Sequence, residues 1–158
     1  MRQESYSYRS PVGYLNCRFN ESFLIALDIQ PDGRATPESK LPVSVRLFWK
    51  ELDCYFEGGI QRFVQPIRFE SGTPFQRRVW QALLRIPFGE TRSYEWLATA
   101  ADSPHGARAA GQAAGKNPLP IIVPCHRIIR ADGGLGGFSC GVEVKRRLLK
   151  HEAAKAKA

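Results

Sequence analysis

Short apolar stretches, separated by turn residues, open the chain. Three segments have the composition of β-strands, at residues 6–9, 14–19 and 23–27. The turn residues Ser10–Gly13 and the polar residues 20–22 separate them. The pattern predicts a short antiparallel meander.

The spacing of apolar positions changes in residues 43–56. Apolar side chains recur near helical spacing there, at Val45, Leu47, Phe48, Leu52, Tyr55 and Phe56. Gly58 and Gly59 predict the end of this helix, because glycine readily takes the left-handed conformation at a helix C-terminus. Residues 60–72 are expected to be an extended linker, so residues 1–72 form a first domain of sheet, helix and linker.

The pattern after residue 72 is helical. Thr73–Gln76 has the sequence of a capping box with proline at the first helical position. The helix that follows has one apolar stripe, and Pro87 is expected to stop it. The stripe consists of Phe75, Val79, Leu83 and Ile86.

Two shorter helices are predicted next. Ser93 is a candidate N-cap for a helix from Tyr94 to about Ala101. Ser103–Pro104 marks the start of another, which ends near Gly115. Two helices joined by a tight turn are typical of a helix-turn-helix.

A last helix is predicted over residues 144–152, with a frayed tail at residues 153–158. Residues 73–158 therefore form a second, helical domain. The fold class expected for the chain is α+β, with a small N-terminal antiparallel sheet and helix before a helical domain.

The predicted helix from Pro104 to Gly115 is built mostly of small residues, and Arg108 is the one long charged side chain in its middle. Small residues let a neighbouring helix pack closely, or they let the helix approach a nucleic-acid backbone. In the second case Arg108 would wedge into a base stack. Few polar side chains are available to read bases in the major groove, so sequence-specific readout is not expected.

Composition places the chain among globular proteins. It has 158 residues, of which 43% are hydrophobic, enough for a sizeable core. No apolar run approaches the ~20 residues that span a bilayer. The first residues lack the apolar core of a signal peptide. We therefore expect a cytoplasmic protein with no membrane partner.

The net positive charge is confined to the second half of the chain. Residues 1–73 carry nine basic and nine acidic side chains, whereas residues 74–158 carry fourteen basic and six acidic, which gives the whole net charge of +8. This segregation indicates that the second half meets a polyanion. No amphipathic basic helix is evident, which favours nucleic acid over a membrane.

Pro124–Arg127, with the sequence Pro-Cys-His-Arg, holds the candidate chemistry. It follows the apolar run 121–123, expected to be a buried strand, and precedes a glycine-rich loop. A thiol beside an imidazole is a candidate nucleophile, because the thiolate is the reactive form. The alternative is an inert buried cysteine. The four cysteines lack Cys-x-x-Cys spacing, and a disulfide framework is not expected in the cytosol. A zinc site is possible but has no support, since only His105, His126 and His151 could join the cysteines.

The segment from Thr73 to Glu152 resembles the O6-alkylguanine-DNA alkyltransferases, or methylated-DNA–protein-cysteine methyltransferases. The resemblance rests on motifs in the same order and spacing, and the N-terminal half fits the family only loosely. The motifs are residues 73–80, 89–94, 107–111, 117–127, 136–139 and 148–152. The resemblance implies a winged-helix-like DNA-binding domain that binds duplex DNA through the minor groove and flips the damaged base out of the stack.

The resemblance also implies a single-turnover repair reaction. Cys125 would take the alkyl group from O6-alkylguanine, and from O4-alkylthymine, without any cofactor. A thioether is a poor leaving group, so the protein would be consumed. His126 and Glu152 would draw the proton from Cys125 through a water. Without the resemblance, Glu152 would be interpreted as a solvated charge.

Further residues take roles from the same resemblance. Tyr94 would donate a hydrogen bond in the pocket, and Asn117 would support the turn before the cysteine. Arg108 would fill the gap left by the flipped base, and Ser139 would lie in the loop that closes the pocket. The substrate- and DNA-binding set is completed by Phe138, Pro120, Ala109 and Gly111. Alternatively, Tyr94 is a core aromatic and Asn117 ends a helix.

Two positions depart from the family pattern. Phe138 stands where many members have tyrosine, and Cys140 stands where glycine or tryptophan is common. Cys140 would narrow the pocket and bring a second thiol near the site. Three other functions are alternatives: a non-catalytic damage sensor, a winged-helix regulator and a cysteine hydrolase. Cys125 argues against the sensor, which usually carries tryptophan there. A monomer is the default expectation.

Overall fold

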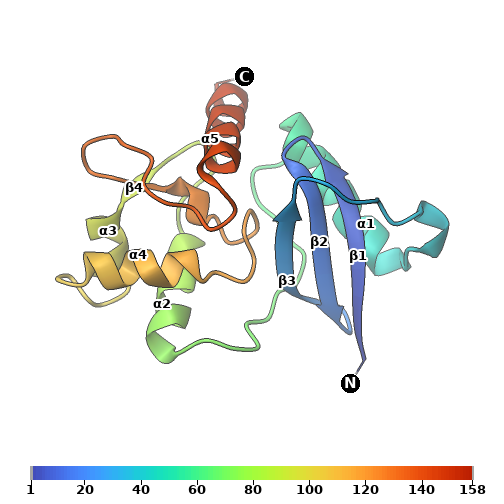
Figure 1. Cartoon of the computed structure of the whole chain (residues 1–158), viewed down its shortest axis with the longest axis horizontal. Coiled ribbons are helices and arrows are strands. Elements are labelled where there is room, and N and C mark those ends of the chain that lie inside the picture. The colour runs from blue at the N-terminus through green and yellow to red at the C-terminus, as the bar shows by residue number, and fades with distance from the viewer. Residues whose placement is uncertain (1, 158) are drawn as a thin grey trace. The chain divides into compact units, whose positions relative to one another are not determined.

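The first three strands form the antiparallel sheet that the sequence predicts. In the computed structural model, which describes residues 2–157, β1 (Gln3–Ser10), β2 (Gly13–Asn20) and β3 (Phe23–Gln30) pair in the order β1-β2-β3 (Figure 1). Cys17 on β2 lies opposite Tyr6 on one side and Leu27 on the other. Alternate β2 side chains, Leu15, Cys17 and Phe19, are buried, as expected for a sheet with one face on a core.

The helix predicted at residues 43–56 is also present. A short 3₁₀ helix, η1 (Glu38–Lys40), precedes α1 (Val43–Glu57). The buried stripe of α1 consists of Val45, Phe48, Leu52 and Tyr55. Gly58 ends α1 with φ 85°, a left-handed conformation that glycine adopts without steric cost. The Tyr8 hydroxyl of β1 donates to Asp53 Oδ1 of α1 at 2.6 Å, which ties the helix to the sheet.

The chain divides into two compact units, one up to Arg68 and one from Phe69 onward. The second unit opens with α2 (Pro74–Leu83), whose capping box is present as predicted. Gln76 N donates to Thr73 Oγ1 at 3.1 Å, and Thr73 N donates to Gln76 Oε1 at 2.9 Å. The sequence predicts that this helix continues to Pro87, which is too far along the chain. The helix ends at Leu83, and a 3₁₀-type turn carries the chain on, in which Ile86 N donates to Leu83 O at 3.1 Å.

The next two helices, α3 (Tyr94–Ala100) and α4 (Ala107–Gly115), form the predicted helix-turn-helix. Ser93 caps α3, because its side chain accepts from Trp96 N at 3.1 Å. The start expected for α4 at Ser103–Pro104 is wrong. Those residues form a tight turn in which Gly106 N donates to Ser103 O at 2.8 Å, with proline at its favoured second position.

The buried strand expected at residues 121–123 is also wrong. These residues are buried, but they lie in a turn in which Val123 N donates to Leu119 O at 2.8 Å. Ile121 has φ 76°, which is incompatible with a strand. The apolar run is followed by a 3₁₀ helix, η2 (Cys125–Arg127), and by β5 (Ile128–Ile129), which pairs in parallel with β4 (Arg92–Ser93).

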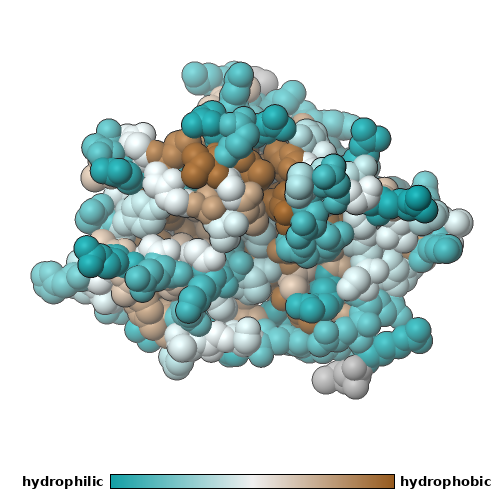
Figure 2. Space-filling model, viewed as in Figure 1, coloured by the Kyte–Doolittle hydropathy of each residue, from teal (hydrophilic) through white to brown (hydrophobic). Residues whose placement is uncertain are grey.

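The last helix is longer than predicted. α5 runs over Val142–Ala156, so residues 153–156 of the tail expected to fray are helical, and residue 158 of that tail lies outside the described residues. Alanine and lysine dominate that tail, and both are strong helix formers. Within residues 2–157, no helix combines the length and apolar character needed to cross a bilayer. In the face drawn in Figure 2, hydrophilic residues are spread widely, and a group of hydrophobic residues is exposed near the upper centre.

Candidate active site

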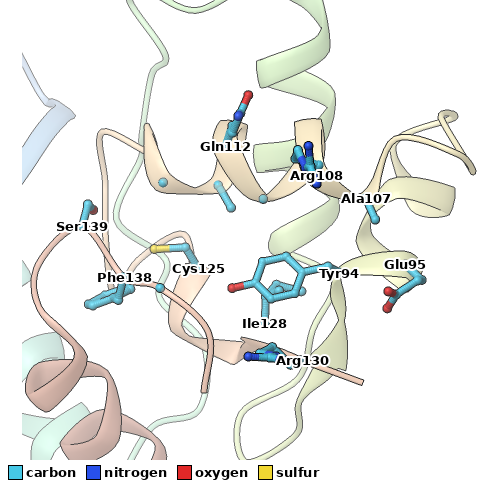
Figure 3. Close-up of a pocket in the computed structure, with 14 residues that line it drawn as sticks. Tyr94, Glu95, Ala107, Arg108, Gln112, Cys125, Ile128, Arg130, Phe138 and Ser139 are labelled. Carbon is cyan, nitrogen blue, oxygen red and sulfur yellow. The ribbon is translucent and has the colours of Figure 1, made fainter. Parts of the chain in front are cut away.

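The helix-turn-helix, η2 and the loop after β5 enclose a pocket of about 860 Å³. This volume lies in the range typical of small-molecule sites. Cys125, Tyr94 and Arg108 line it, together with Phe138 and Ser139 from the loop (Figure 3). The structure therefore brings these five predicted site residues together. In Figure 3 the Cys125 thiol and the Tyr94 hydroxyl both point into the space between α4 and the loop.

Asn117 holds the turn that presents Cys125. Its Nδ2 donates to Val123 O at 2.7 Å, and its Oδ1 accepts from Leu119 N at 2.9 Å. The turn is closed further by Cys125 N, which donates to Val123 O at 2.8 Å. Asn117 is buried, so these bonds are made away from water. The side chain thus fixes the backbone immediately before the cysteine.

Cys125 is buried beneath the pocket and is a weak acid at rest. Burial raises the pKa of the Cys125 thiol to about 12, while Asn117 and the charge of Lys145 act in the opposite direction. The neutral thiol is therefore the dominant form near neutral pH. Thiolate chemistry at this position requires a group that accepts the proton.

His126 and Glu152 form a buried pair behind Cys125. His126 Nε2 lies 2.7 Å from Glu152 Oε2, and the side chains are 0% and 1% exposed. Burial lowers the pKa of His126 although the bond to Glu152 opposes this, so the imidazole is neutral near pH 7. With a neutral ring, Nε2–H donates to the carboxylate and Nδ1 is left unprotonated. Within residues 2–157, buried Nδ1 has no hydrogen-bond partner.

Arg127 completes this cluster through both oxygens of Glu152. Its Nε donates to Glu152 Oε1 at 2.8 Å and its Nη2 to Glu152 Oε2 at 3.0 Å, while Nη1 donates to Ile86 O at 2.6 Å. Burial acts to raise the pKa of Glu152, but the bonds from His126 and Arg127 outweigh it and hold that pKa well below its usual range. Glu152 is therefore an anchored carboxylate.

Lys145 of α5 is a buried cation next to the pocket. It is 0% exposed, and its Nζ donates to Ile128 O at 2.6 Å and to Gly137 O at 3.2 Å. These bonds join β5 to the loop that borders the pocket. Burial lowers the pKa of Lys145 to about 8, while the Cys125 thiolate would raise it. Lys145 is thus a positive charge placed near the candidate nucleophile.

Tyr94 is fixed between a helix and the loop by two glycines. A Cβ on Gly111 of α4 would lie 3.1 Å from the Tyr94 ring, and a Cβ on Gly136 would meet its hydroxyl. Gly136 also has φ 72°, so only glycine fits there without strain. Burial raises the pKa of Tyr94, and a hydrogen bond with the Gly137 backbone lowers it. The phenol therefore stays a hydrogen-bond donor at neutral pH.

Small residues of α4 lie both on the face that packs against a neighbouring helix and on the face that borders the pocket. Ala110, Ala113 and Ala114 are buried, and Trp80 Nε1 of α2 donates to Ala113 O at 2.8 Å. This face packs on a neighbouring helix, as the first of the two alternatives predicts. The other face carries Arg108 and Gly111, which line the pocket. The second alternative, an approach of this helix to a nucleic-acid backbone, stays a prediction.

Not every predicted residue lines the pocket. Ala109 is exposed on α4 outside the lining, and Pro120 is buried in the turn before Cys125. His126 and Glu152 lie beneath the lining. Sequence reasoning missed the parts played by Arg127, Lys145 and Gly136. Arg127 belongs to the Pro-Cys-His-Arg motif, which was the one signal available for it.

Known proteins match this chain over both units. Residues 74–154 match the family model for the 6-O-methylguanine DNA methyltransferase DNA-binding domain. A methylated-DNA–protein-cysteine methyltransferase of Mycobacterium tuberculosis is 49% identical over 68% of the chain and 65% of its own length. The chain thus spans about two thirds of the length of that relative. One from Methanosarcina barkeri is 38% identical over 90% of the chain and 92% of its own length.

A solved structure gives the same assignment. The structure of the Mycobacterium tuberculosis O6-methylguanine methyltransferase OGT in complex with DNA superposes with a TM-score of 0.85 and 39% identity, over 96% of this chain and 93% of that one. Sequence and fold therefore agree over both compact units. The chain belongs to the family of methylated-DNA–protein-cysteine methyltransferases.

Proposed function

We propose that this chain repairs DNA by transferring the alkyl group from O6-alkylguanine, and from O4-alkylthymine, to the sulfur of Cys125. The observation that carries the proposal is a thiol in the floor of a pocket, backed by the buried His126–Glu152 pair. The relatives named for this reaction support the same activity. No cofactor enters the proposal, because a thiolate attacks an alkyl carbon without one.

The buried pair supplies the base. His126 Nε2–H is held on Glu152, so Nδ1 is the nitrogen left to take the proton from Cys125, through a bridging water as in the family. The imidazolium that forms is stabilised by the Glu152 carboxylate. Arg127 keeps that carboxylate ionised and in place. Lys145 adds a positive charge that favours the thiolate.

The alkyl transfer itself is a displacement at carbon. The sulfur forms a bond to the alkyl carbon, the bond from that carbon to guanine O6 breaks, and the electron pair leaves with the oxygen. A hydrogen-bond donor near that oxygen stabilises the developing charge. We assign this role to Tyr94, whose hydroxyl points into the pocket, with Ser139 on the facing loop (Figure 3). The thioether product does not release the sulfur, so each molecule acts once.

The DNA-binding surface is proposed to be the face of α4 that borders the pocket. Arg108 is exposed beside the opening, and Arg130 also lines it. The net charge of the second half suits a phosphate backbone. We infer that α4 enters the minor groove of duplex DNA, that the damaged base rotates into the pocket, and that Arg108 takes its place in the stack. The chain would act in the cytoplasm as a monomer.

Replacing Arg108 with alanine tests the flipping step. Repair of O6-methylguanine in a duplex should slow strongly, because the gap left by the base is no longer filled. Reaction with free O6-benzylguanine, which needs no flipping, should change little. Arg146→Ala, on the exposed face of α5, is the matched control. Equal losses for both substrates in Arg108→Ala would remove the role given to this side chain.

Replacing Cys125 with alanine tests the reaction itself. Binding to a duplex that contains O6-methylguanine should persist, because Arg108 and the other basic residues of the second half are untouched, while demethylation of the DNA should cease. Both are read on one substrate, by mobility shift and by analysis of the DNA bases. Demethylation that survives the change would refute the assignment of Cys125. Binding without demethylation by the unmodified chain would instead favour a damage sensor.

A further inference from the structure

A second thiol directly follows a residue that lines the candidate active site. Cys140 directly follows Ser139, which lines the same pocket as Cys125, and it is half-buried. The two cysteines interact electrostatically, since Cys140 acts to raise the pKa of Cys125. Neither is disulfide-bonded in this structure. In Figure 3 the Cys125 sulfur points toward the segment that contains Phe138 and Ser139.

The loop that carries Cys140 is anchored on both sides of it. Gly137 O accepts from Lys145 Nζ at 3.2 Å, and Gly141 N donates to Phe138 O at 3.0 Å. These bonds hold the segment in which Cys140 directly follows the lining residue Ser139. A Cβ added at Gly137 or at Gly141 would have no atom within 4 Å, so neither residue is packed against a neighbour on that side. A disulfide needs the Cα atoms of its two cysteines within about 7 Å, and a loop that is loosely packed on both sides of Cys140 favours such an approach.

We propose that Cys140 is a resolving cysteine, which forms a reversible disulfide with Cys125 when a peroxide oxidises the active-site thiol. The inference rests on the proposed function only in taking Cys125 as the reactive thiol of this pocket. The disulfide would block alkyl transfer while it lasts. It would also protect the sulfur from further oxidation, because sulfinic and sulfonic acids are not reduced by ordinary thiols.

The chemistry balances in two steps. The Cys125 thiolate attacks one oxygen of the peroxide, the O–O bond breaks, and Cys125 becomes a sulfenic acid as hydroxide leaves. The Cys140 sulfur then attacks the sulfenic sulfur, the S–O bond breaks, and water leaves with the Cys140 proton. Two electrons pass from the pair of thiols to the peroxide. His126 serves the first step as it serves alkyl transfer, by accepting the Cys125 proton.

The test is a peptide map of the full-length protein after treatment with hydrogen peroxide and trapping of remaining thiols with N-ethylmaleimide. Trypsin cuts after Lys116, Arg127, Arg130 and Lys145, so the expected product joins peptide 117–127 to peptide 131–145. Cys140→Ser should abolish this product and leave Cys125 open to sulfinic acid formation. Cys54→Ser, a change in the other compact unit, is the matched control and should keep it.

Alkyl transfer, measured on the same samples before and after dithiothreitol, separates the inference about the Cys125–Cys140 disulfide from the proposed repair function. Recovery of most activity in the wild type, against a several-fold smaller recovery in Cys140→Ser, is the expected result. Oxygen addition at Cys125 with no joined peptide would overturn the inference and leave the repair function intact. A joined peptide in a protein that never accepts an alkyl group would support the inference and refute the repair function.

Discussion

At the scale of single residues, Glu152 links the largest number of charged partners in the site. It accepts from His126 and twice from Arg127 while 1% exposed. A buried carboxylate with these partners orients the imidazole, and it also neutralises a buried guanidinium. Function and stability therefore depend on the same side chain.

Replacing Glu152 with glutamine should separate these effects. Alkyl transfer should slow by about 10²-fold, because the imidazole loses its anion. The free energy of unfolding should fall by about 3 kcal/mol, since Arg127 keeps a buried charge without its counter-charge. Denaturant unfolding and single-turnover transfer measure the two. Glu143→Gln changes a carboxylate on the same helix that is 62% exposed, and its stability should stay within about 0.5 kcal/mol. If the folded Glu152→Gln variant transferred the alkyl group at the wild-type rate, the role of the His126–Glu152 pair would be contradicted.

The sequence predicts some of these residues and misses others for a physical reason. Cys125 and His126 lie in a short motif whose chemistry can be recognised in one dimension. Lys145 cannot be found that way, because lysine on an amphipathic helix is expected to face water. Its burial is evident only when α5, β5 and the pocket loop are seen together.

At the scale of elements, the capping and glycine signals are confirmed, whereas the two proline signals, at Pro87 and at Ser103–Pro104, misplace a helix end. The capping box of α2, the Ser93 cap of α3 and the glycine end of α1 are all present where predicted. The error at residues 121–123 has a clear cause. A short apolar run indicates burial but does not distinguish a strand from a turn. Here the side chain of Asn117 decides the outcome, because it bonds to both ends of the turn.

The loop after β5 offers a test at this scale. Gly136→Ala would place a Cβ against the Tyr94 hydroxyl at a backbone φ of 72°. Tyr94 or the loop must move, and methyl transfer should fall by about 10²-fold. Gly137→Ala adds a Cβ with no atom within 4 Å, so its loss should be much smaller. Single-turnover rates compare the two variants. Equal rates for both would mean that the position of Tyr94 does not matter.

At the scale of the whole molecule, the uneven charge distribution is the feature that depends on no single contact. The second half of the chain carries the entire net charge of +8. Charge at that scale can be read from the sequence, but the arrangement of α4, the loop and the pocket cannot. That arrangement depends on contacts between segments far apart in the chain, such as the bond from Trp80 to Ala113.

DNA affinity should therefore fall steeply with salt. If the basic face contacts six or more phosphates, the affinity drops by about 10³-fold or more between ~50 and ~200 mM salt, because bound counterions are released. Fluorescence anisotropy with a labelled duplex measures this slope. An affinity independent of salt would contradict a DNA-facing basic surface.

The measurement that tests the central claim most directly is the intact mass of the protein after incubation with duplex DNA containing O6-methylguanine, followed by peptide mapping. We predict that each molecule gains one methyl group, that the gain stops at one equivalent, and that it lies on Cys125 in peptide 117–127. An unchanged mass with DNA binding retained, or a methyl group on any other residue, would contradict the assignment of Cys125 as the acceptor.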